Sequence, residues 1–122
     1  MQWWRQSEAD LQAAELNLKY KQFYVAVFLC QQAVEKGLKA VYIEKKRSSP
    51  GTTHSLIYLA SEIGIQKKHM PFLRKLTPQF VNTRYPDAAY GTPQELYDEE
   101  IAREFFTGSQ EVMQWLRSQI GK

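Results

Sequence analysis

The stretch from Phe23 to Arg47, FYVAVFLCQQAVEKGLKAVYIEKKR, decides the fold class of this chain. It contains no proline, and its apolar residues return at steps of three and four, the period of one face of an α-helix. These apolar positions are Phe23, Val27, Cys30, Val34, Leu38 and Val41. No other segment carries such a long uninterrupted pattern. We therefore expect one central helix over Phe23–Arg47, with the other helices packed on it.

A second stripe of the same period carries amides and charges at Gln32, Glu35, Lys36 and Lys39. Glu35 and Lys39 have the i,i+4 spacing, with Glu first, that favours an ion pair on an exposed helix. Three interpretations stay open: a solvated face, a lined ligand groove, and a contact with another subunit. On the second interpretation, Gln32, Lys36 and Lys39 are candidate ligand-binding residues.

The composition favours one folded domain over residues 1–122. The chain is 43% hydrophobic and 13% aromatic, which suits a packed core and argues against disorder. The net charge is +3, but ten basic and two acidic residues fall between Lys36 and Arg84, while three basic and seven acidic residues fall between Tyr85 and the end. A positive region of this kind suits phosphates or an acidic protein surface, and it is also compatible with ordinary surface charge.

The single cysteine and the short apolar runs point to a cytoplasmic protein. Cys30 lies on the apolar stripe, so we expect a buried thiol and no disulfide scaffold. The longest apolar run, Phe23–Cys30, has eight residues and is too short to span a membrane. The first ten residues lack the apolar region of a signal peptide.

Helix start and stop signals define a helix on each side of the central one. Ser7 as a side-chain cap predicts a first helix over Glu8–Lys21. After the loop SSPGTT, His54 or Ser55 begins a short helix that Gly64 ends.

Prolines mark the remaining helices. Pro71 suits the first turn of a fourth helix, and Pro78 predicts a kink or a division into two short helices. Thr92 and Pro93 predict the start of a last helix that runs to about Ile120. The expected inner side of that last helix consists of Ile101, Phe105, Val112, Trp115 and Leu116. No segment reads as a strand, so we predict an all-α fold: a compact up-and-down bundle of about five helices.

The sequence lacks the residue patterns of most known catalytic and metal-binding sites. The only histidines, His54 and His69, are not spaced as metal ligands with Cys30, so we expect no metal and no cofactor. There is no Gly-rich phosphate loop and no serine nucleophile elbow.

The segment TRYPDAAY, residues 83–90, is the best candidate site. Its Arg84 can donate two parallel hydrogen bonds to a phosphate, and Tyr85 can stack on a base. Asp87 and Tyr90 complete the set of candidate functional side chains. A structural interpretation stays open, in which Arg84 caps a helix or pairs with Asp87 and Tyr85 belongs to the core.

The chain resembles HEPN-domain proteins, a family named for nucleotide binding. The matching stretches are CQQAVEKGLKA at 30–40, THSL at 53–56 and TRYP at 83–86, with Ala9, Asp10, Leu11, Tyr24, Ala26, Phe28 and Trp115 in support. The resemblance implies a compact, commonly dimeric all-α fold. It also implies a frequent association with a minimal nucleotidyltransferase, as toxin and antitoxin, and for many members metal-independent RNA cleavage at a cleft between two protomers.

The ribonuclease members carry a His after the Arg that Arg84 matches, with four to six residues between the two. The corresponding positions here are Ala89, Tyr90 and Gly91. RNA cleavage without metal needs a group that moves a proton, and an arginine titrates far too high to do so. The group that moves the proton would have to be Asp87, Tyr90 or His54, supplied across a dimer interface.

Three hypotheses follow. The first is a dimeric module that binds nucleotide or RNA and a minimal nucleotidyltransferase partner without cutting, with Tyr85 or Tyr90 as a possible site of modification. The second is a metal-independent ribonuclease toxin that uses Arg84 with a non-standard proton-transfer group. Neither involves a cofactor or a membrane. A third hypothesis is a structural partner whose helices complete another protein's core.

Overall fold

The computed structural model describes residues 1–85 and 91–121, and every regular element in these two ranges is helical. The α-helices are α1 (Gln2–Lys19), α2 (Phe23–Lys46), α3 (Leu56–Ile63), α4 (Met70–Leu76), α5 (Gln79–Asn82), α6 (Pro93–Leu96) and α7 (Glu99–Gln119), with a 3-10 turn over Lys67–His69. Five of these α-helices have seven residues or more, which confirms the all-α prediction of about five helices.

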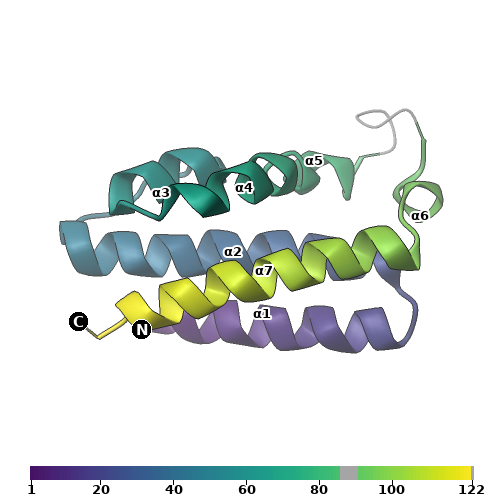
Figure 1. Ribbon diagram of the computed structural model, residues 1–122, viewed down its shortest axis with the longest axis horizontal. Coiled ribbons are helices and arrows are strands. Elements are labelled where there is room, and N and C mark those ends of the chain that lie inside the picture. The colour runs from purple at the N-terminus through teal and green to yellow at the C-terminus, as the bar shows by residue number, and fades with distance from the viewer. Residues whose placement is uncertain (86–90, 122) are drawn as a thin grey trace.

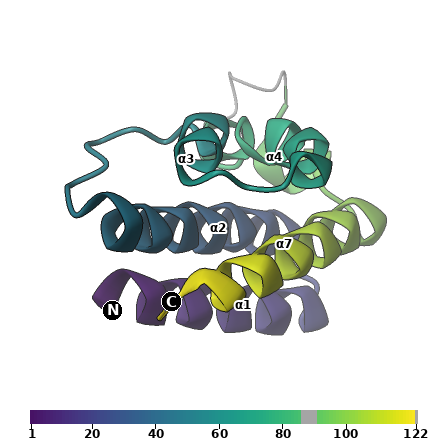
Figure 2. The same cartoon turned by 60° about the vertical axis from the view of Figure 1, so that its left-hand side comes forward.

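Helix α2 is central, as the sequence predicted. α1 runs antiparallel along one side of it, α3, α4 and α5 lie along the opposite side, and α7 crosses in front (Figures 1 and 2). α2 ends at Lys46, and Arg47 adopts the left-handed conformation with φ 55° while its N–H bonds to the Ile43 carbonyl. This C-cap closes the helix one residue before the predicted end.

The apolar stripe of α2 forms the centre of the core. Val27, Cys30, Val34, Leu38 and Val41 are each 0% exposed, and Phe23 is partly buried. Where α1, α2 and α7 meet, Gly37 allows close approach: a Cβ there would lie 3.0 Å from Ser7 Oγ and 3.1 Å from Met113 Sδ. The small residue therefore sets the distance between the three longest helices.

The predicted start of α1 at Glu8 was wrong, because the helix begins at Gln2. Ser7 does not cap it but lies fully buried within it, and its hydroxyl donates to the Ala33 carbonyl at 2.7 Å. A serine that finds an acceptor on another helix has no need to cap its own. The additional turn brings Trp4 into the core at 5% exposure.

The predictions for the middle of the chain were confirmed. Ser55 caps α3 by accepting the Tyr58 N–H at 3.2 Å, and Gly64 ends it with φ 72°. Pro78 separates α4 from α5, which divides the fourth helical segment in two.

The prediction of one continuous helix from Pro93 to about Ile120 was wrong. α6 stops at Leu96, Tyr97 is extended, and Asp98 starts α7 by accepting the Ile101 N–H at 2.8 Å. Tyr97 is buried, and its hydroxyl donates to the side-chain oxygen of Gln79. Burial raises the pKa of the Tyr97 phenol to about 12.

The inner side of α7 also differs in part from the prediction. Val112 and Leu116 are buried as expected, whereas Ile101, Phe105 and Trp115 are only partly buried. The other buried residues of α7 are Ala102, Phe106, Ser109 and Met113. The buried face of α7 is thus shifted by about one residue along the helix from the face that we predicted. Within the described residues, no helix is both long enough and apolar enough to cross a membrane.

Candidate functional site

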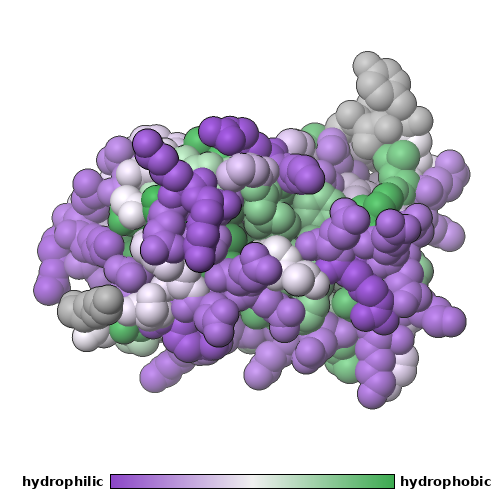
Figure 3. All heavy atoms as spheres, in the orientation of Figure 1, coloured by the Kyte–Doolittle hydropathy of each residue, from purple (hydrophilic) through white to green (hydrophobic). Residues whose placement is uncertain are grey.

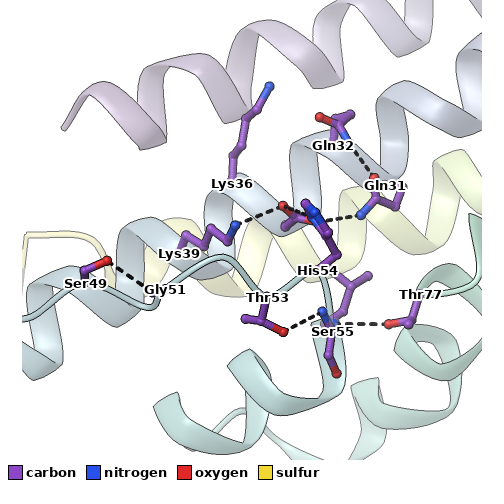
Figure 4. Close-up of polar contacts among 12 residues, drawn as sticks. Gln31, Gln32, Lys36, Lys39, Ser49, Gly51, Thr53, His54, Ser55 and Thr77 are labelled. Carbon is purple, nitrogen blue, oxygen red and sulfur yellow. Dashed lines mark hydrogen bonds and ion pairs between the residues drawn. The ribbon is translucent and has the colours of Figure 1, made fainter. Parts of the chain in front are cut away.

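The THSL segment that leads into α3 is anchored by hydroxyl groups on both sides. Thr53 Oγ1 accepts the Ser55 N–H at 3.0 Å, and Thr77 Oγ1 accepts the Leu56 N–H at 3.2 Å (Figure 4). Leu56 itself is fully buried. These contacts fix the backbone on each side of His54, so the direction of its side chain is set by the fold.

His54 reaches across to α2 and contacts Glu35. Its Nδ1 lies 3.1 Å from both carboxylate oxygens of Glu35. The Glu35 side chain is 8% exposed and the His54 side chain 50% exposed, so the imidazole joins a buried carboxylate to the surface. The ring also stacks on Phe80, with centroids 3.8 Å apart and planes 18° from parallel.

Two further donors hold the Glu35 carboxylate. Gln31 Nε2 donates to Oε1 at 2.8 Å, and Lys39 Nζ donates to Oε2 at 3.1 Å. Glu35 and Lys39 are 6% and 5% exposed, so the solvated-face interpretation of this stripe was wrong for these two residues. In Figure 4 the network lies in front of α2, and the pale yellow ribbon of α7 runs behind it.

The candidate ligand-binding residues of α2 have partners within the protein. Gln32 Nε2 donates to Gln31 Oε1 at 2.6 Å, and Lys36 Nζ pairs with Asp10 Oδ2 at 2.6 Å. Lys39, besides its bond to Glu35, lies 5.5 Å from the ring centroid of Trp3. The prediction that Gln32, Lys36 and Lys39 contact a ligand remains a prediction. Within the protein, Lys36 joins α1 to α2, and Lys39 holds the Glu35 carboxylate in place.

Arg84 lies on aromatic rings. Its guanidinium carbon is 4.2 Å from the ring centroid of Phe80 and 5.1 Å from that of Phe28. The side chain is exposed, and within residues 1–85 and 91–121 it forms no ion pair. The neighbouring Tyr85 is 56% exposed, so the structural interpretation that placed it in the core was wrong. Asp87 and Tyr90 lie outside the described residues.

Phe80 brings Arg84 and His54 together in one protomer. The His54 ring centroid lies 3.8 Å from the Phe80 centroid and the Arg84 guanidinium carbon 4.2 Å from it, so both groups contact the same phenyl ring. Sequence reasoning kept His54 for a contribution across a dimer interface and did not single out Phe80. The spacing of Phe80 and Arg84, four residues apart along a helical turn, was the available signal.

A groove on the surface lies apart from the cluster of His54, Phe80 and Arg84. A groove of about 640 Å³ between α4 and α7 is lined by Phe72, Lys75, Glu100, Arg103, Glu104, Phe105 and Thr107, and hydrophobic surface shows between these helices in Figure 3. It contains none of the residues that the sequence singled out as ligand contacts. Among the described residues, no group of three His, Cys, Asp or Glu is placed to hold a metal ion.

Known proteins share this arrangement of helices. The crystal structure of TT1696 from Thermus thermophilus superposes with a TM-score of 0.87 over 98% of this chain and 96% of that one, at 23% identity, a likeness of fold alone. ST0689, described as an archaeal HEPN homologue, superposes with a TM-score of 0.83 over 98% and 95% of the two chains, at 28% identity.

Sequence comparison agrees. A protein of Methanocaldococcus jannaschii named "Putative toxin MJ1304" is 28% identical over 93% of this chain and 82% of its own length. The family model described as HEPN domain matches residues 1–119. This chain therefore belongs to the HEPN domain family.

Proposed function

We propose that this protein is a HEPN-type binding and interaction module, with residues 1–122 acting as one domain, that uses Arg84 to hold a phosphate group of a nucleotide or RNA. The observation that carries the proposal is the exposed guanidinium of Arg84 resting on Phe80 and Phe28. Rings beneath a guanidinium restrict its orientation and leave its N–H edges free to donate. That is the geometry that a planar fork needs to bind phosphate.

We place the module in a cytoplasmic toxin–antitoxin-like pair. It would act as a homodimer with a minimal nucleotidyltransferase as its partner, and the support is the HEPN membership together with the relative named as a toxin. Tyr85, exposed beside Arg84, and Tyr90 are the side chains that such a partner would modify. Asp87 adds a carboxylate to the ligand-binding set.

Binding of labelled single-stranded RNA and of nucleotides, measured by fluorescence anisotropy at fixed ionic strength, tests the Arg84 assignment. Loss of a charge-assisted, bidentate contact weakens binding by about tenfold or more, so Arg84→Ala should show that loss. The matched control is Arg74→Ala, which removes an exposed arginine from α4. Equal affinity for wild type and Arg84→Ala would refute the proposal. Light scattering of the same samples reports the dimer.

A second candidate function is metal-independent ribonuclease activity. The observation in its favour is that His54 and Arg84 contact the same Phe80 ring within one protomer, so one cluster holds a group able to move a proton and a group able to stabilise phosphate charge. RNA cleavage in the presence of EDTA, lost in Arg84→Ala, would support this function. Asp87 and Tyr90 would then be tested as further participants. If the wild-type protein leaves the RNA intact, the ribonuclease function is refuted and the binding module remains.

A further inference from the structure

A second pocket, of about 340 Å³, lies where the turn over Lys67–His69 approaches α7. The residues that line it come from the turn and the position before it, and from the second half of α7: Gln66, Lys68, His69, Glu111, Gln114 and Trp115. It shares no residue with the cluster of His54, Phe80 and Arg84. Its volume lies within the range of sites that hold small molecules.

His69 contributes a buried imidazole to this pocket. The residue is 7% exposed, and its Nε2 is buried without a hydrogen-bond partner among the described residues. Buried nitrogens are nearly always paired, either within the protein or with a bound molecule. Burial lowers the pKa of His69, so the ring is uncharged at neutral pH and adds no charge of its own. The imidazole is therefore a neutral group with hydrogen-bonding capacity left for a bound molecule.

Lys68 and Glu111 add one charge of each sign, the first from the turn and the second from α7. Both lie close enough to His69 to act on its pKa, which Lys68 lowers and Glu111 raises, each by less than burial does. Within residues 1–85 and 91–121, neither of them forms an ion pair, with the other or elsewhere. Both charges are thus available to groups of opposite sign on one bound molecule.

Trp115 gives the pocket an apolar wall. The side chain is only partly buried, and its ring centroid lies 6.5 Å from that of His69. Lys45 Nζ lies 5.8 Å from the indole centroid and also donates to the Ile63 carbonyl. These contacts hold the indole beside His69, so an apolar group in the pocket has a fixed aromatic surface to pack on.

From this arrangement we propose that the pocket binds a free α-amino acid with an apolar side chain. Its carboxylate pairs with Lys68, its ammonium pairs with Glu111, and its side chain packs on Trp115. The ammonium carries three hydrogens, so it can donate to the His69 ring as well. A zwitterion matches a pocket with one charge of each sign, whereas Glu111 repels a phosphate and Lys68 repels a simple amine. The site does not depend on the proposed phosphate contact of Arg84.

The test titrates the protein with three compounds that share a phenyl ring: L-phenylalanine, phenethylamine and 3-phenylpropanoate. The second compound lacks the carboxylate and the third lacks the ammonium. The readout is the NMR signal of the Trp115 indole N–H, which reports binding at this pocket. Loss of one charge-assisted contact weakens binding by about tenfold, so L-phenylalanine should bind tighter than either of the other two by that factor.

Two exposed residues allow the charges to be removed one at a time. Glu111→Gln should weaken L-phenylalanine and phenethylamine without weakening 3-phenylpropanoate, because only the first two carry an ammonium. Lys68→Met should weaken L-phenylalanine and 3-phenylpropanoate without weakening phenethylamine. The controls are Glu104→Gln on α7 and Lys67→Met in the turn, which remove exposed charges outside the pocket and should bind as the wild type does.

The outcomes are distinct from those that test the proposed function. An unchanged Trp115 signal with L-phenylalanine overturns the amino-acid site. Equal affinity for the three compounds, or the same loss for all three in Glu111→Gln and Lys68→Met, overturns it as well, because the two charges would then not be recognised. Arg84→Ala should bind L-phenylalanine as the wild type does, and a loss in that variant would contradict a separate site.

Discussion

The two sides of α2 are both buried, but different forces stabilise them. On the apolar stripe, Leu38 and Cys30 are fully buried and exclude water from the core. On the other side, Glu35 and Lys39 are taken out of water as an ion pair with His54 at its edge. Burial of charges is costly, so such a pair is weak evidence of added stability. Its evident effect here is to hold the His54 ring in a defined direction.

The largest effect should come from breaking the charged side. Glu35→Ala leaves Lys39 buried at 5% exposure without its counter-charge, and the expected loss in the free energy of unfolding is about 4 kcal/mol. Urea denaturation measures it. Glu35→Gln keeps an acceptor oxygen and should lose less. A loss below about 1 kcal/mol for Glu35→Ala would show that Lys39 reaches water by rearrangement, as exposed pairs do.

A change on the apolar side of α2 should lower the free energy of unfolding by somewhat less. Leu38→Ala removes a fully buried side chain and leaves a cavity, at an expected cost of about 3 kcal/mol. Leu38→Met conserves volume and should cost less than about 1.5 kcal/mol in the same denaturation experiment. If Leu38→Ala and Leu38→Met were equally unstable, the shape of the side chain rather than its buried volume would determine the stability of the apolar side of α2.

A rise in pH should weaken the apolar side through Cys30. Burial raises the pKa of this thiol from 9.0 to about 12, while the unfolded chain regains the ordinary value. Between these two pKa values the unfolded state binds fewer protons than the native state, so stability is full below about pH 9 and falls above it. The expected loss from this group at pH 10 is about 1.4 kcal/mol. Cys30→Ala should show a correspondingly flatter decline, and an identical decline would contradict the assignment.

The smallest change should follow loss of the hydroxyl that joins α1 to α2. Ser7→Ala removes the donor to the Ala33 carbonyl, and the expected loss is about 1 kcal/mol, the usual net value of one hydrogen bond. Thermal unfolding measures it, with Ser118→Ala on the exposed end of α7 as the control. A gain in stability would mean that packing beside Gly37 is relieved by the smaller side chain.

The sequence by itself determined the helices whose signals are local. The three-and-four period fixed the extent and apolar side of α2, Ser55 and Gly64 bounded α3, and Pro78 divided α4 from α5. Each of these rests on the backbone preferences of neighbouring residues, which act before any distant contact forms. The family motifs were local in the same sense.

The tertiary structure decided everything that depends on a distant partner. Ser7 lies within α1 because its hydroxyl finds Ala33 on α2, and the break at Tyr97 accompanies the bond of its hydroxyl to Gln79. The candidate site is the clearest case, because His54 and Arg84 meet only through Phe80. His54 and Arg84 are thirty positions apart in the sequence. No periodicity in the sequence specifies that contact, since it arises from the packing of α3 and α5 against the polar side of α2.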